Sequence, residues 1–157
     1  LEGLPLSALE QVYRERLKLM PGARELVRAC RDAGIRTLLI SGGFTFFTDR
    51  LRDELGLDHA VANELEVVNG HLTGRLLGDV IDAQAKADWL VRLRDEMGLA
   101  PAQTIAMGDG ANDLKMLAVA GLGVGMHPKP VLRQHADVSL RYVGLDGLPR
   151  LFAPAVS

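Results

Sequence analysis

Apolar residues along the chain fall into two patterns, which together predict a sheet covered by helices. Spacings of three or four are typical of amphipathic helices, and short continuous apolar runs are typical of strands buried on both faces. The expected helices are 7–17 with Ser7 as N-cap, a second around 26–30 ending at Gly34, 44–55 closed by Gly56, 82–97, 112–120 and 129–135. The expected strands are 35–40, 60–62, 104–107, 122–126 and 138–140. This alternation predicts the α/β class with a doubly wound parallel sheet.

Residues 64–77 depart from that alternation. Apolar and polar residues there alternate one by one, as in half-buried strands, and Asn69-Gly70 stands in the middle. An Asn-Gly pair between two alternating segments favours a two-residue hairpin turn. We therefore expect one β-hairpin inserted in an otherwise α/β body.

Composition and charge narrow the class of partner. The 157 residues suit one domain, and 18 basic against 20 acidic side chains give a net charge of −2, without the basic excess of nucleic-acid binders. The single cysteine, Cys30, fits a reducing compartment. No apolar run reaches the roughly 20 residues of a membrane helix, and the first residues lack the pattern of a signal peptide. We expect a cytoplasmic, soluble domain that binds neither nucleic acid nor membrane.

The first candidate site is Ser41-Gly42-Gly43, which follows the strand expected at 35–40. In open α/β sheets ligands bind beyond the carboxyl ends of the strands. A hydroxyl and glycine amides at a helix start suit an anion. A tight strand-to-helix turn that needs glycine explains the motif equally well.

The second candidate site is the loop Gly108-Asp109-Gly110-Ala111-Asn112-Asp113. Two carboxylates and an amide at a strand end suit a hard cation such as Mg²⁺, which usually takes one or two protein carboxylates together with phosphate oxygens and waters. The alternative is that Asp113 caps the following helix while Asp109 sits in a turn. The concentration of acids among glycines favours the metal interpretation.

Lys86 is the third candidate. It aligns with Leu90, Leu93 and Met97 on the apolar face of the helix expected over 82–97. Its ammonium could extend past that face into water. Alternatively, a fixed ammonium near the start of the helix could neutralise a phosphoryl group.

Four segments of the chain closely resemble the bacterial phosphoserine phosphatase family of the haloacid dehalogenase superfamily, over residues 19–140. They are LMPGARELV, LLISGGFTFFTDRLRDELGL, VANELEVVNGHLTGRLLGDVIDAQAKADWL and IAMGDGANDLKMLAVAGLGVGMHPKP. The resemblance implies that the Ser41 hydroxyl and the Gly42 amide hold the substrate phosphoryl group. It implies that Lys86 neutralises charge on the phosphoryl oxygens and that Asn112 lies close to the bound phosphate.

For the acidic loop, the resemblance implies that Asp109 is a ligand of Mg²⁺ and that Asp113 supports the metal site and the lysine. The implied reaction is hydrolysis of O-phospho-L-serine to L-serine and phosphate, the last step of serine biosynthesis, through an aspartyl-phosphate. Fixed positive charge around the transferring oxygens agrees with that chemistry.

One departure from the family pattern is large. Family members open the catalytic domain with a strand ending in Asp-x-Asp-x-Thr, whose first aspartate is the nucleophile and whose second is the general acid, and no Asp-x-Asp occurs in this chain. We therefore expect a sheet that lacks the central nucleophile-bearing strand, with residues 1–19 as the end of a helical cap and residues 20–157 as the core. The nucleophile would lie upstream, in a complementing N-terminal segment.

Two other functions stay open. One is a related phosphatase for another small phosphomonoester, and the other is a non-catalytic phosphate-binding fragment. Whether the protein forms a homodimer also stays open.

Overall fold

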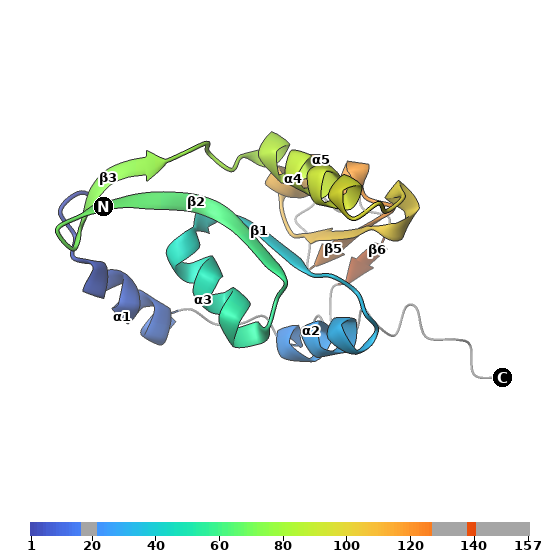
Figure 1. Cartoon of the computed structure of the whole chain (residues 1–157), viewed down its shortest axis with the longest axis horizontal. Helices are drawn as coiled ribbons and strands as arrows, with labels where there is room; N and C mark the ends of the chain where they lie inside the picture. Colours follow the sequence, from blue (N-terminus) through green and yellow to red (C-terminus); the bar gives the residue numbers. More distant parts are fainter. Residues whose placement is uncertain (17–21, 127–137, 141–157) are drawn as a thin grey trace. The chain divides into compact units, whose positions relative to one another are not determined.

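The computed structural model describes residues 1–16, 22–126 and 138–140. Residues 1–81 form one compact unit, and the described residues from 82 onward belong to a second (Figure 1). Each unit contains a three-stranded sheet among these residues. No helix in the described part of the chain is long and apolar enough to cross a membrane.

The first unit is built around its central strand. Its helices are α1 (Leu6–Arg16), α2 (Ala23–Asp32) and α3 (Thr45–Leu55), and its strands are β1 (Leu38–Phe44), β2 (His59–Val68) and β3 (His71–Leu77). β2 pairs parallel with β1 and antiparallel with β3. α3 connects the parallel pair and packs against both strands, as an α/β crossover requires.

The first strand begins later than its apolar run predicts. We expected a strand over 35–40, whereas β1 starts at Leu38 and continues through the glycines to Phe44. Ile35 is used instead to end α2: its N–H donates to Cys30 O at 2.8 Å, and the Gly34 N–H donates to Arg31 O at 3.1 Å. This is a Schellman motif, and Gly34 supplies the positive φ of 73° that it needs.

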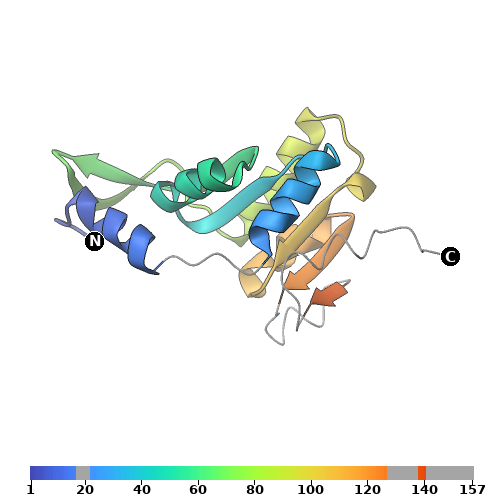
Figure 2. The same ribbon diagram turned by 90° about the horizontal axis from the view of Figure 1, so that it is seen from below.

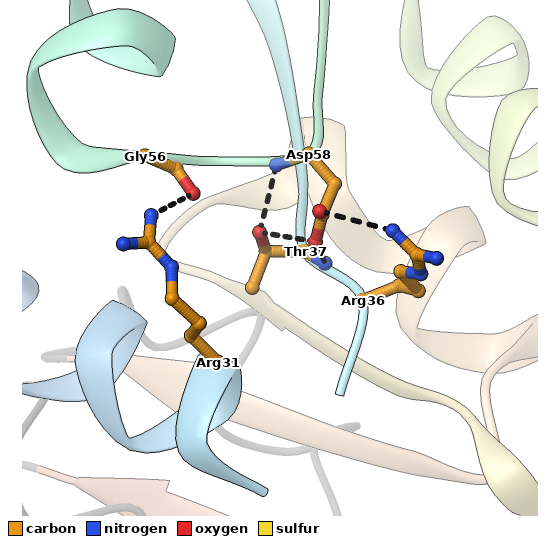
Figure 3. Close-up of polar contacts among 5 residues, drawn as sticks. All are labelled: Arg31, Arg36, Thr37, Gly56 and Asp58. Atoms are coloured by element: carbon orange, nitrogen blue, oxygen red, sulfur yellow. Dashed lines mark hydrogen bonds and ion pairs between the residues drawn. The ribbon is translucent and has the colours of Figure 1, made fainter. Parts of the chain in front are cut away.

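A reciprocal clamp joins the starts of β1 and β2 (Figure 3). The Thr37 N–H donates to Asp58 Oδ2 at 2.8 Å, and the Asp58 N–H donates to Thr37 Oγ1 at 3.1 Å. Arg36 pairs with Asp58 Oδ1 at 3.3 Å, and Arg31 donates to Gly56 O close by. The hydrogen bond from the Thr37 backbone is the largest cause that holds the pKa of Asp58 below its ordinary value.

The antiparallel pair at residues 64–77 is present. β2 and β3 are joined by Asn69 and Gly70, whose φ angles of 53° and 75° match the turn that Asn-Gly favours. The expected strand at 60–62 is not separate, because the same extended backbone pairs with β1 and then with β3. In both views α1 lies beside the hairpin (Figures 1 and 2), and Leu9 and Leu72 are buried there.

The second unit is a parallel sheet with helices. It contains α4 (Ala83–Glu96), a 3₁₀ turn (Pro101–Gln103), β4 (Ile105–Gly108), a 3₁₀ turn (Ala111–Asp113), α5 (Leu114–Val119), β5 (Leu122–Met126) and β6 (Val138–Leu140). The strand order is β4-β5-β6, and both pairs are parallel. Val124 is fully buried at the centre of this sheet, as expected for a strand covered on both faces.

Two helix starts differ from the sequence prediction. Ser7 lies inside α1 and is not its N-cap, because the first turn already forms when the Ala8 N–H donates to Pro5 O at 2.9 Å. The helix expected over 112–120 divides into a 3₁₀ turn and α5, which starts at Leu114. Leu17, the boundary between residues 19 and 20, and the helix expected over 129–135 lie outside the described residues.

Candidate functional site

A buried ion pair is the main polar feature of the second unit. Lys86 projects from the first turn of α4, is 6% exposed, and donates from Nζ to Asp113 Oδ1 at 2.9 Å. The interpretation in which the ammonium extends into water is therefore wrong. The helix start that fixes Lys86 is capped as the sequence predicts, since Asp82 Oδ1 accepts the Ala85 N–H at 2.8 Å.

Asp113 connects this lysine to the loop after β4. Its second carboxylate oxygen, Oδ2, accepts the N–H of Asp109 at 3.1 Å and the N–H of Gly110 at 3.4 Å. Asp113 stands at the N-cap position of α5 without a side-chain bond to that helix, and its carboxylate closes the preceding 3₁₀ turn through the Gly110 N–H, so capping accounts for part of its role but not for its contact with Lys86. Asp113 holds the loop and the lysine together from a buried position.

β4 ends in a glycine because a side chain at position 108 would overlap Asp113. A Cβ at this position would lie 2.4 Å from Asp113 Cβ and 2.5 Å from its carboxyl carbon, closer than atoms can approach. The loop can therefore fold over the Asp113 carboxylate only if residue 108 has no side chain. Gly108 is thus part of the site through packing.

Asp109, Ala111 and Asn112 are the exposed residues of this loop. Asp109 follows directly on the carboxyl end of β4, and its carboxylate has no hydrogen-bond or ion-pair partner within the described ranges 1–16, 22–126 and 138–140. A free anionic oxygen donor suits a hard cation. The described residues contain no cluster of three or more His, Cys, Asp or Glu side chains able to hold a metal.

The loop Ser41-Gly42-Gly43 belongs to β1 and bulges from it. Between the pairs Ile40–Val61 and Phe44–Asn63, β1 advances four residues while β2 advances two. The Gly43 N–H donates to Ser41 Oγ at 2.9 Å, and the hydroxyl hydrogen stays available to donate to an anion. Of the predicted site residues, Ser41 and Gly42 lie in the first unit, whereas the others lie in the second.

One buried polar residue was not singled out from the sequence. Asn63 on β2 is 6% exposed, and its carboxamide contacts Gly42 and Ile81. The sequence signal that could have identified it is an asparagine directly after the apolar residues 60–62. A polar side chain next to a buried strand must find hydrogen-bond partners in the interior.

Comparison with known proteins identifies the family. A model of the haloacid dehalogenase-like hydrolases matches residues 1–118. A phosphoserine phosphatase of Polaromonas sp. is 50% identical over 155 residues, which cover 96% of this chain and 66% of that protein. A crystal structure described as a probable phosphoserine phosphatase from Vibrio cholerae is 46% identical with a TM-score of 0.92, and the match covers 95% of this chain and 46% of that one.

A third structure, described as a phospho-aspartyl intermediate analogue of phosphoserine phosphatase, is 33% identical with a TM-score of 0.89. The match covers 96% of this chain and 72% of that one. The chain spans between 35% and 67% of the length of curated relatives that it matches. These structural matches confirm the α/β fold with a parallel sheet, and because the family match extends over more than half of its residues, the chain belongs to the haloacid dehalogenase-like hydrolase family.

Proposed function

We propose that this chain is part of a phosphomonoester hydrolase that converts O-phospho-L-serine and water to L-serine and phosphate. The observation that carries the proposal is the buried Lys86–Asp113 pair, whose carboxylate also gathers the backbone N–H groups of Asp109 and Gly110. A buried pair of this kind is weak evidence for stability alone. It is well explained as a means of fixing a lysine and an acidic loop for phosphoryl chemistry. The substrate is inferred from relatives that are named phosphoserine phosphatase.

The residues of this chain would stabilise the transferring group. The Ser41 hydroxyl and the Gly42 N–H would donate to phosphoryl oxygens, and Asn112 would lie near the same oxygens. Lys86 would neutralise the negative charge on them, at a position fixed by Asp113. Such preorganised donors and charges are the main way in which proteins accelerate phosphoryl transfer.

The carboxylate of Asp109 would hold Mg²⁺. Its exposure, its place at the end of β4 and its lack of a partner among the described residues support that role. When bound, the cation would supply positive charge to the phosphoryl oxygens and to the attacking carboxylate. Its further ligands would be substrate oxygens, waters and carboxylates outside this chain.

The nucleophile would come from an upstream segment that ends a strand in Asp-x-Asp-x-Thr. The first aspartate would attack phosphorus, the bond from phosphorus to the serine oxygen would break, and the second aspartate would protonate the leaving oxygen. Water would then attack the phosphorus of the aspartyl-phosphate and release phosphate. The absence of Asp-x-Asp from the sequence supports this arrangement. Further support comes from the similarity to a phosphoserine phosphatase structure described as a phospho-aspartyl intermediate analogue.

The proposal is tested by complementation. Phosphate release from O-phospho-L-serine is measured for residues 1–157 alone, for the chain co-expressed with the upstream segment, and for the same pair with the first aspartate of the motif changed to asparagine. We expect activity only in the second case. Hydrolysis by the chain alone would refute the upstream nucleophile. A faster reaction with another small phosphomonoester would refute the proposed substrate. A complemented protein that binds phosphate but does not hydrolyse the substrate would favour the non-catalytic phosphate-binding function.

A further inference from the structure

Asn63 lies where the ladder between β1 and β2 is interrupted. β1 needs two more residues than β2 to pass from the pair Ile40–Val61 to the pair Phe44–Asn63. The extra length forms the bulge Ser41-Gly42-Gly43, so regular pairing is lost at the point where the loop leaves the strand. The bulged backbone, half-buried at Ser41 and Gly43 and exposed at Gly42, has lost its ladder partners and is positioned by other hydrogen bonds.

The carboxamide of Asn63 supplies two such bonds. Its Nδ2 donates to Gly42 O at 2.9 Å, and its Oδ1 accepts the N–H of Ile81 at 2.7 Å. Ile81 also lies next to the loop, because a Cβ on Gly42 would stand 3.6 Å from Ile81 O. One buried side chain therefore connects the middle of the bulge to a second backbone segment 39 residues further along the sequence.

A carboxamide meets both requirements at this position at any pH, whereas an ionised carboxylate does not. The Gly42 carbonyl needs a donor and the Ile81 N–H needs an acceptor, and asparagine presents the two on one planar group. An ionised aspartate of the same shape would keep the bond to Ile81 but would direct a second oxygen at Gly42 O. Alanine would remove both bonds, leaving the N–H of the buried residue Ile81 unpaired and the Gly42 carbonyl free to move.

We propose that Asn63 is a positioning residue for phosphate binding, because it sets the orientation of the Ser41–Gly42 backbone by holding the Gly42 carbonyl. The Gly42 carbonyl belongs to the same three-residue loop as the Ser41 hydroxyl and the Gly42 N–H, so a shift of this carbonyl changes the direction of both donors. Asn63 itself does not contact the phosphoryl group. The inference rests on the proposed function, since it assigns Asn63 to the same loop.

The test compares Asn63→Asp with Asn69→Asp in the complemented protein. The two variants make the same chemical change on the same hairpin, but Asn69 is exposed in the turn, where aspartate accepts the positive φ. The measurements are KM and kcat for O-phospho-L-serine and inhibition by inorganic phosphate. We expect Asn63→Asp to raise KM and to weaken phosphate inhibition by roughly 10- to 100-fold, the scale of a small misplacement of a binding group.

The pH profile separates positioning from a general loss of stability. A protonated carboxyl can donate to Gly42 O and still accept from Ile81, so phosphate inhibition of Asn63→Asp, relative to the parent at each pH, should recover as the pH falls from about 8 to about 5. Asn69→Asp should follow the parent across this range. Asn63→Ala serves as a second variant, and it should show the same weakening without the recovery.

The outcomes are distinct. If Asn63→Asp and Asn63→Ala lower only the melting temperature and keep KM and phosphate inhibition within about twofold of Asn69→Asp, Asn63 is merely structural and the inference is wrong. A parent protein that neither hydrolyses O-phospho-L-serine nor is inhibited by phosphate would instead overturn the proposed function and, with it, this inference. An active parent with weakened, pH-dependent phosphate inhibition in Asn63→Asp supports both.

Discussion

Replacing Lys86 with methionine tests the buried ion pair directly. Lys86 and Asp113 meet at 2.9 Å, and their side chains are 7% and 8% exposed. Removing one partner of such a pair leaves a buried charge without compensation, which typically costs about 3–5 kcal/mol. Methionine keeps most of the apolar stem, so the change isolates the charge from the packing.

The structure places the expected cost near the lower end of that range. After the substitution Asp113 Oδ2 still accepts the N–H groups of Asp109 and Gly110, and these bonds keep part of the carboxylate charge solvated. We therefore expect Lys86→Met to lower the free energy of unfolding by about 3 kcal/mol. Lys115→Met is the matched control, because Lys115 is an exposed lysine in the same unit, and its effect should stay within about 0.5 kcal/mol.

Urea denaturation followed by the fluorescence of Trp89 provides the assay. Trp89 is the only tryptophan of the chain and lies on α4, three positions after Lys86. The double variant Lys86→Met with Asp113→Asn removes both charges and should recover at least about 1 kcal/mol relative to the sum of the single variants. A cost below about 1 kcal/mol for Lys86→Met, or one equal to that of Lys115→Met, would refute the assignment of a desolvated pair.

Two further predictions concern the other carboxylates. Asp109→Asn in the complemented protein should raise the Mg²⁺ concentration needed for half-maximal activity, because one anionic ligand is lost; identical Mg²⁺ titrations of variant and parent would contradict the ligand role. The pKa of Asp58 is lowered in the folded protein, chiefly by the Thr37 N–H, so the clamp stabilises the fold above the pKa of the unfolded chain and loses this effect as the pH falls through the folded value. Urea midpoints measured from about pH 6 to pH 2 should therefore fall less steeply for Asp58→Asn than for the parent, whereas parallel curves would show that the clamp does not contribute.

Elements with local signals could be predicted from the sequence. α4 begins after its Asp82 cap and ends at Glu96, two residues before Gly98, whose φ of 68° and N–H to Asp95 O are those of a Schellman motif. β5 occupies residues 122–126 as predicted. A short apolar run that contains glycines favours a strand over a helix or a loop. In these cases the residues that determine the structure are close together in the sequence.

The geometry of the candidate site depends on distant residues, which explains what the sequence could not show. Whether Lys86 was buried depended on a partner 27 positions away, and only the fold brings Asp113 to it. The extension of β1 through Ser41–Gly43 depends on pairing with β2 at Asn63. Periodicity gives the face on which a residue lies but not the partner that it meets there, so pattern alone left both interpretations of Lys86 open.

β1 and β4 each have an edge to which a further strand could be added. Within residues 1–16, 22–126 and 138–140, β1 pairs only with β2, and β4 only with β5, so each has an edge without a partner. An unpaired strand edge presents a row of N–H and C=O groups with which a further strand can pair. The Ser41 loop lies near the carboxyl end of β1, and β4 leads into Asp109. A parallel strand added at either edge would therefore have its carboxyl end beside a candidate site loop. Under the proposed function, a strand ending in Asp-x-Asp-x-Thr would pair with one of these edges and supply the nucleophile, so we expect co-expression with the upstream segment to stabilise the chain and to restore catalysis together.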